Sequence, residues 1–195
     1  SSSSVYGNTP DLPWGEHEKA DKPLSPYGAT KRSIELLAYP YHHNFKMNIT
    51  CLRYFNAYGE GNRPSMVPYL WTEALLTGKE IEMSGDGTRK RDYTYIGDAV
   101  SATITAMEKP LGYEIINIGD SHPVSLKELL SVFEKVTGIR AMVKTRPSHH
   151  ASAEATYANI EKAKKLLGWE PKVPIEEGIA KLVAWFKNHR LKNIV

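Results

Sequence analysis

From residue 49 onward, short apolar segments alternate with segments whose apolar residues recur at the period of a helix. Strands are predicted at 49–55, 80–83, 92–96, 114–118 and 140–144, and helices at 67–76 and at 98–107 with Asp98 as its cap. A further helix is opened by Ser125, with Glu128 three residues later, and ended by Gly138. This alternation predicts an α/β class, with a largely parallel sheet first and a smaller mixed region after about residue 120.

The first and last helices have distinct signals. Apolar residues of the last helix recur at helical spacing and predict a core-packing helix; they are Ile175, Ile179, Leu182, Val183 and Phe186. Ser25-Pro26 is a strong start signal for the first helix, because Ser caps free N–H groups and Pro suits the first helical position. We expect its apolar residues Ile34, Leu37, Ala38, Tyr41 and Phe45 to face inward. Pro40 should kink or end this helix near residues 35–36.

Composition narrows the class of protein. With 195 residues, 41% of them hydrophobic and 24% charged, the chain is long enough for one sizeable core. The net charge is only +3 and its basic residues are scattered, which argues against nucleic-acid or membrane-surface binding. No apolar stretch approaches the ~20 residues that span a bilayer. The single cysteine, Cys51, lies in an apolar run, so a reducing, cytoplasmic setting is expected.

Tyr27 and Lys31 are four residues apart near the start of the first helix, so both project from the same helical face. An ammonium group beside a phenol favours the phenolate and lowers a pKa that is ~10 when unperturbed. A tyrosine in such a pair can act as a general base near neutral pH. The pair alone is a weak signal, because the same spacing arises by chance on many helices.

Four ordered sequence blocks give the pair its context: Ser-Ser-Ser-Val-Tyr-Gly at 2–7, Ser-Pro-Tyr-Gly-Ala-Thr-Lys at 25–31, Leu-Arg-Tyr-Phe-Asn at 52–56 and Arg-Asp-Tyr at 91–93. In this order the blocks resemble the extended short-chain dehydrogenase/reductase family, and within it the nucleotide-sugar epimerases. The resemblance continues through Asn-Ile-Gly at 117–119 and Lys-Leu-Leu-Gly-Trp at 165–169. It implies the later part of a Rossmann-like parallel sheet with flanking helices, plus a small mixed α/β substrate-binding region.

The resemblance also implies a mechanism that uses NAD. Tyr27 would remove the proton of a sugar hydroxyl while the adjacent carbon gives its hydride to NAD. Lys31 would bind the nicotinamide ribose, and Ser2 would hydrogen-bond the reacting hydroxyl. The resulting ketone would turn over and take the hydride back on its other face, which inverts the carbon. Tyr54 and Tyr6 belong to blocks that border the nicotinamide pocket in similar proteins, so both are expected to face the cofactor.

The residues after Ser2 separate branches of the family. Dehydratases of this family carry an acidic pair there, and decarboxylating relatives also favour an acidic residue, whereas this chain has Ser3 and Ser4. The sequence therefore favours epimerisation, in which oxidation and reduction occur without elimination. Ser2 and Ser3 are expected to contact the substrate. A dehydratase or decarboxylase on the same scaffold stays an alternative. So does a non-catalytic module that binds sugar nucleotides.

The resemblance assigns the diphosphate of a nucleotide sugar, expected to be UDP-linked, to Asn56 and Arg91, since a diphosphate needs compact donors and a guanidinium. On their own, Arg91 and Asp92 are equally well interpreted as a surface ion pair. Arg63 resembles an arginine that faces the sugar carboxylate in uronate 4-epimerases, yet those enzymes usually have Thr at the position of Asn56. The sequence thus indicates a C4 epimerase and leaves two substrate classes open, a UDP-hexose or a UDP-hexuronate.

A second arginine for the diphosphate, present in many relatives, is missing from its usual place. His149 falls at that position, and Arg146 lies three residues earlier. We expect one of these two residues to substitute. The adjacent histidine pairs of the chain lack further ligands at metal spacing, so no metal site is predicted.

The glycine-rich turn Gly-x-Gly-x-x-Gly, which binds the pyrophosphate of a dinucleotide, appears nowhere in the sequence. We therefore expect a chain that represents the later portion of an epimerase and that, alone, does not hold NAD tightly and is inactive. Residues 1–120 would form the rest of the Rossmann-like domain, interleaved with substrate-binding segments at 57–90, and residues 121–195 mainly a substrate-binding region. Relatives pair as homodimers through the helix of the Tyr-Lys pair, in which Pro40 is a departure.

Overall fold

The computed structural model describes residues 1–147 and 155–191. In chain order its elements are η1 (Ser3–Tyr6), α1 (Pro26–Phe45), β1 (Ile49–Tyr54), β2 (Ala57–Tyr58), α2 (Val67–Thr77), β3 (Ile81–Ser84), β4 (Lys90–Arg91), β5 (Thr94–Tyr95), α3 (Ile96–Glu108), β6 (Tyr113–Ile118), β7 (Val124–Ser125), α4 (Leu126–Thr137), β8 (Val143–Arg146), α5 (Glu161–Leu167) and α6 (Ile175–His189). Strands and helices alternate as the sequence predicts, and the α/β class is confirmed.

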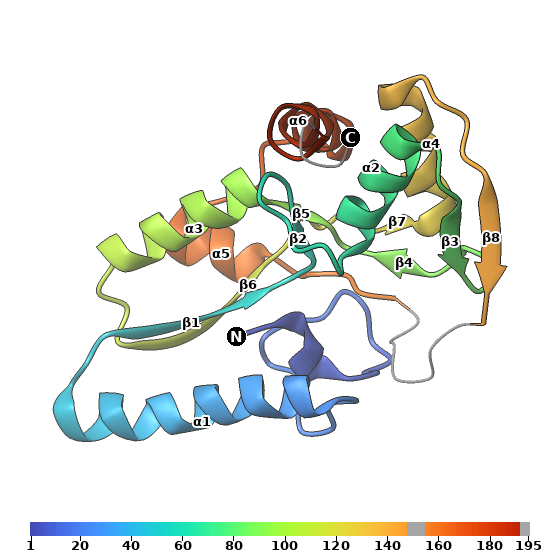
Figure 1. Cartoon of the computed structure of the whole chain (residues 1–195). Helices are drawn as coiled ribbons and strands as arrows, with labels where there is room; N and C mark the ends of the chain where they lie inside the picture. Colours follow the sequence, from blue (N-terminus) through green and yellow to red (C-terminus); the bar gives the residue numbers. More distant parts are fainter. Residues whose placement is uncertain (148–154, 192–195) are drawn as a thin grey trace.

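The longest strands, β1 and β6, lie side by side and parallel, with Ile49 opposite Tyr113 and Tyr54 opposite Ile118. Figure 1 shows α1 on one side of this pair and α3 with α5 on the other. The strands are therefore covered on both faces, and even their polar residues Arg53 and Asn117 are buried. Parallel strands end at the same edge, so the residues that follow β1 and β6 emerge together.

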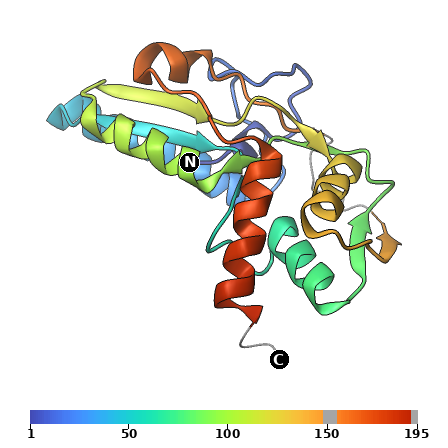
Figure 2. The ribbon, with the colours of Figure 1, turned by 90° about the horizontal axis from the view of Figure 1, so that it is seen from above.

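Three shorter strand pairs extend the molecule beyond this edge. β2 pairs with β5 and β3 with β8, both parallel, whereas β4 pairs antiparallel with β7. Helices α2, α4 and α6 gather around these strands, as the view in Figure 2 shows. Parallel and antiparallel pairs are thus both present, but β3 and β4, which precede residue 120, pair with β8 and β7, which follow it.

Two groups of buried side chains form the core. One lies around β1, β6, α3 and α5 and includes Trp14, Phe55 and Ile116. The other lies among α2, α4 and α6 and includes Phe133 and Ile179. The predicted capping box holds α4, because the Ser125 hydroxyl accepts from the backbone N–H of Glu128 and the Glu128 carboxylate accepts from that of Ser125. Along α6, the predicted stripe from Ile179 to Phe186 is buried.

Two expectations for α1 are wrong. Four of the five residues expected to face inward are exposed: Ile34, Leu37, Tyr41 and Phe45. The buried side of α1 carries Glu35 instead, because an ion pair to β1 replaces apolar packing there. Pro40 does not interrupt the helix, which is continuous from Pro26 to Phe45. Pro40 lies on the exposed side of α1. It has no N–H for the backbone carbonyl four residues earlier, so that carbonyl is left to water.

Asp98 is also placed differently from the prediction. It lies in the first turn of α3 but makes no capping bond there, and the cap position is Tyr95. Its carboxylate accepts from the backbone N–H groups of Lys172 and Val173, at 3.1 and 3.0 Å. Asp98 thus ties the segment before α6 to α3. Within residues 1–147 and 155–191, no helix is both long and apolar enough to cross a bilayer.

Candidate functional site

The first turns of α1 present the Tyr-Lys pair. The Ser25 hydroxyl caps the helix by accepting from the backbone N–H of Gly28 at 3.1 Å, and Pro26 occupies the first position, as predicted. Tyr27 and Lys31 therefore lie one helical turn apart, with the Lys31 Nζ 5.5 Å from the centre of the Tyr27 ring. Tyr27 is about half exposed, so its phenol is open to a ligand.

The serine segment, residues 1–4, lies across from this pair. Ser2 forms a parallel bridge with Tyr54, the last residue of β1, so the segment enters at the same sheet edge. Ser2 also caps the short helix η1, where its hydroxyl accepts from the backbone N–H of Ser4 at 3.2 Å. Ser2 and Ser3 are both buried against the fold. The cap and the bridge together hold the Ser2 backbone and hydroxyl in place.

A cavity of about 610 Å³, here called the tyrosine cavity, opens between these two segments and the chain that follows β1. It brings together seven residues predicted from the sequence: Ser2, Ser3, Tyr27, Lys31, Tyr54, Asn56 and Arg63. Its charged lining residues, within the part of the chain that the structure describes, are Lys31 and Arg63, both cationic. An anionic ligand with hydroxyl groups suits this set, because serine and asparagine supply hydrogen bonds and the cations supply charge.

A second cavity of about 260 Å³, here called the arginine cavity, adjoins the first, since Asn56 and Met66 line both. Arg89, Arg91 and Arg146 line it, and no carboxylate does among the residues of 1–147 and 155–191. Arg146 closes β8 directly opposite Ser84 of β3, and its Nη1 lies 3.4 Å from the Glu82 carboxylate on the solvent side. Guanidinium groups in such a cluster match the geometry of phosphate oxygens.

Burial lowers the pKa of Arg91 from its ordinary value, since the charged form loses hydration there. Asp92, next in sequence, is fully buried, so the surface ion-pair interpretation is wrong for it. The Asp92 carboxylate accepts backbone N–H groups of Asp120, Ser121 and Ala158, at 2.8 to 3.1 Å. Asp92 therefore anchors the segment that delivers Arg91 to the arginine cavity.

Not every expected residue reaches the site. Tyr6 is buried in the core, where its hydroxyl donates to Asn117 at 2.7 Å, so it does not face a cofactor. Tyr54 lines the tyrosine cavity, while its hydroxyl lies 2.7 Å from that of Thr103 on α3. His149 lies outside the described residues. Arg146, the other candidate for the second arginine, does line the arginine cavity.

Sequence reasoning missed several lining residues, among them Asn62, Met66, Ser84 and Arg89. Asn62 and Met66 lie within three residues of Arg63, so the motif around Arg63 could have indicated them as lining residues. Ser84 reaches the arginine cavity through the register of β3 with β8, a pairing of residues about 60 apart in sequence that a local pattern does not encode. Arg89 lies directly before β4, whose partner β7 is also distant in sequence.

Comparison with known proteins gives a consistent family match. Residues 1–119 match the model of the NAD dependent epimerase/dehydratase family. UDP-glucuronate 4-epimerase of Thermodesulfobacterium geofontis is 44% identical over 191 residues, which is 97% of this chain and 58% of that protein. The probable UDP-glucuronate 4-epimerase of Rhizobium meliloti is 32% identical over 210 residues, with 62% of its length covered.

Solved structures agree with this match. The crystal structure of UDP-glucuronic acid 4-epimerase from Bacillus cereus, in complex with UDP-glucuronic acid and NAD, superposes with a TM-score of 0.90 at 36% identity, over 96% of this chain and 60% of that one. UDP-glucose 4-epimerase from Thermotoga maritima, with UDP-glucose, gives 0.92 at 34% identity, over 96% and 62%. The chain thus spans about three-fifths of the length of these relatives.

Proposed function

Because the chain belongs to the NAD dependent epimerase/dehydratase family, we propose that it carries the catalytic and substrate-binding residues of a UDP-sugar 4-epimerase. The observation that carries the proposal is the tyrosine cavity, in which Ser2, Tyr27 and Lys31 from two separate segments line one space. Relatives named as UDP-glucuronate 4-epimerases favour a UDP-hexuronate as substrate. The cationic Arg63 in the same cavity supports that choice, because a uronate adds a carboxylate to the sugar.

The residues present suit the nicotinamide end of NAD. Tyr27 and Lys31 offer a hydroxyl and an ammonium group on adjacent turns, a donor set for ribose hydroxyls. No stretch of the sequence offers the glycine-rich turn for the pyrophosphate. NAD, when bound, supplies the capacity to accept a hydride from C4 of the sugar and to return it.

The remaining steps fall to the residues of the chain. Tyr27 acts as the base that takes the proton of the 4-hydroxyl group, while Ser2 holds that oxygen by a hydrogen bond. Lys31 places its ammonium group beside the Tyr27 ring, 5.5 Å from the ring centre. After the 4-keto sugar has turned over, Tyr27 returns the proton to the same oxygen, so protons and electrons balance over the cycle. Asn56, Arg91 and Arg146 hold the diphosphate meanwhile, which keeps the ketone in the site.

Three further proposals concern the whole protein. The UDP-sugar fits across both cavities, with its diphosphate at the arginine cavity and its sugar at the tyrosine cavity. The exposed apolar stripe of α1 (Ile34, Leu37, Tyr41 and Phe45) supports pairing of two copies through this helix. The free, buried Cys51 supports a reducing, cytoplasmic location.

Replacing Tyr27 tests the assignment of the base. In a protein of the relatives' full length, Tyr27→Phe keeps the ring but removes the proton acceptor, so we expect turnover to fall by about 10²-fold or more. Binding of the nucleotide sugar, measured by calorimetry, should change little because the arginine cavity is intact. A Tyr39→Phe variant, which removes an exposed phenol of the same helix outside both cavities, serves as the control. Near-normal turnover by Tyr27→Phe would overturn the assignment.

A further inference from the structure

Glu35 lies where the segments that build the tyrosine cavity meet. It follows Tyr27 and Lys31 at successive four-residue steps along α1, so the three side chains share one side of the helix. The Glu35 side chain is fully buried, whereas Tyr27 is open to the cavity. Residue 35 is therefore one of the points at which the helix that bears the Tyr-Lys pair is attached to the rest of the fold.

The Glu35 carboxylate accepts hydrogen bonds from three separate segments. Arg53 of β1 donates through Nε and Nη2, both at 2.8 Å, in a bidentate pair. Arg32 of α1 donates at 2.8 Å, and the Ser1 hydroxyl at 2.6 Å, directly before Ser2. Although burial opposes ionisation, the hydrogen bonds from Arg53 and Ser1 hold the pKa of Glu35 below its ordinary value. One carboxylate thus joins α1, β1 and the serine segment.

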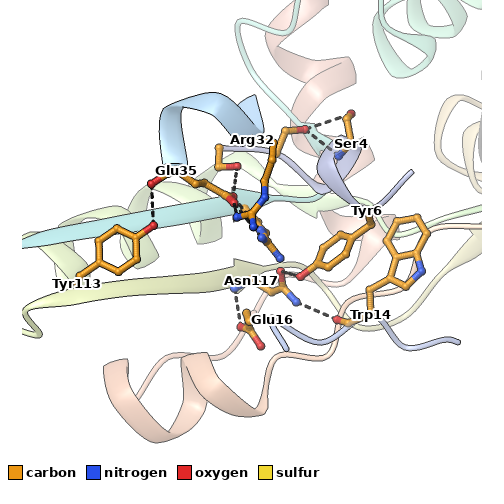
Figure 3. Close-up of polar contacts among 11 residues, drawn as sticks. Ser4, Tyr6, Trp14, Glu16, Arg32, Glu35, Tyr113 and Asn117 are labelled. Carbon is orange, nitrogen blue, oxygen red and sulfur yellow. Dashed lines mark hydrogen bonds and ion pairs between the residues drawn. The ribbon is translucent and has the colours of Figure 1, made fainter. Parts of the chain in front are cut away.

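The contacts continue on both sides of this carboxylate. The Tyr113 hydroxyl of β6 donates to the Glu35 backbone carbonyl at 2.8 Å, as Figure 3 shows. The Arg53 guanidinium lies 4.7 Å from the centre of the Tyr6 ring, and Tyr6 comes two residues after Ser4, the last residue of the serine segment. Tyr6 in turn donates to Asn117, which also bonds the Trp14 carbonyl (Figure 3).

Stability alone does not explain why a buried ion pair, Glu35 with Arg53, stands at this position. Apolar residues of similar volume often stabilise a core as well as a buried ion pair does. A guanidinium fork on a carboxylate adds a fixed distance and a fixed orientation, because its two parallel bonds tolerate little rotation. At this position the fork sets the register of α1 against β1. Tyr54, the residue after Arg53, ends β1 at the cavity, so that register also sets Tyr27 against Tyr54 and Ser2.

We propose that Glu35 and Arg53 are positioning residues, which hold α1 in the register that places Tyr27 and Lys31 opposite Ser2. The inference rests on the proposed function, because it concerns the geometry of the proposed base. Neither residue lines the tyrosine cavity in the described chain, so neither touches the sugar. Loss of the fork should therefore impair turnover and leave substrate binding at the arginine cavity unchanged.

Two variants in a protein of the relatives' full length test this. Glu35→Gln removes the charge at constant shape, and Arg53→Lys keeps the charge but not the fork, so it carries the test if Glu35→Gln does not fold. Asp98→Asn is the matched control, since Asp98 is also a buried carboxylate that joins two segments, but outside both cavities. The readouts are kcat and KM for UDP-glucuronate, the melting temperature, and amide hydrogen exchange of residues 26–33 in the unliganded protein.

We expect kcat to fall by about 10-fold or more in Glu35→Gln and Arg53→Lys, with KM within about threefold, because small misplacement of a base affects the chemical step. Exchange at residues 26–33 should rise in both. Asp98→Asn should lower the melting temperature and leave kcat and that exchange unchanged. Equal loss of kcat in all three variants, or unchanged exchange at 26–33, would overturn the proposal. An inactive wild type would refute the proposed function instead, while the exchange measurement would still test the positioning.

Discussion

Asp120, which follows β6, is a largely buried carboxylate whose ionisation depends on its surroundings. Burial, together with the nearby Asp92 carboxylate, raises the pKa of Asp120 from 3.8 to about 6. Between these two pH values the folded state keeps a proton that the unfolded state has released. The free energy of unfolding therefore falls as the pH rises through this window, and the penalty is complete above about pH 6.

Asp120→Asn should remove this penalty. The backbone N–H of Asp120, which donates to Asp92, is kept in the variant. After allowance for solvent screening, we expect the variant to be more stable than the wild type by about 1 kcal/mol at pH 7 and equal to it below about pH 4. Denaturant unfolding at both pH values measures the difference. A gain of the same size at both, or a loss at pH 7, contradicts the assignment.

Also at the residue scale, the sequence predicted which residues line the tyrosine cavity, but it did not predict the structural roles of the residues that support them. The sequence contains short ordered blocks that hold Ser2, Tyr27, Lys31 and Asn56. Each block lies either at the edge where β1 ends or at the start of α1. Asp92 shows what a local pattern lacks. Its three backbone donors come from residues 120, 121 and 158, so only the folded chain reveals that it is an anchor.

At the scale of elements, helices with both a start signal and a period were predicted well. The capping box of α4 and the stripe of α6 are examples, because local bonds and one apolar face define each. The two-residue strands β2, β4, β5 and β7 carry no period of their own, so pairing with distant segments alone defines them. In α1, the most apolar stripe is not the buried side, because an ion pair occupies that side.

The exposed stripe of α1 leads to a prediction about assembly. In a protein of the relatives' full length, we expect a homodimer that the double variant Leu37→Glu with Tyr41→Glu converts to monomers, because charges are costly in an apolar interface. Met107→Glu is the control, since Met107 is an exposed apolar residue of another helix, α3. Sedimentation velocity measures the masses. A monomeric wild type, or a double variant that stays dimeric, would refute pairing through this helix.

At the scale of the whole molecule, the residues of the proposed substrate site and the proposed base lie together in a chain that spans about three-fifths of its relatives. The tyrosine and arginine cavities share Asn56 and Met66, so the two cavities adjoin, as the proposed binding of a UDP-sugar across both requires. The sequence predicted this grouping from the order of its blocks. It did not predict how β3 and β8 bring Arg146 to the path, because that register joins distant segments.

The identity of the product tests the central claim most directly. A protein of the relatives' full length, supplied with NAD and UDP-glucuronate, should form the C4 epimer, visible in proton NMR as a change of the coupling at H4. No keto sugar and no pentose should accumulate, because the serine segment offers no acidic residue for elimination. UDP-glucose should be converted more slowly. Accumulation of a 4-keto sugar or of a UDP-pentose in place of the epimer would contradict the account.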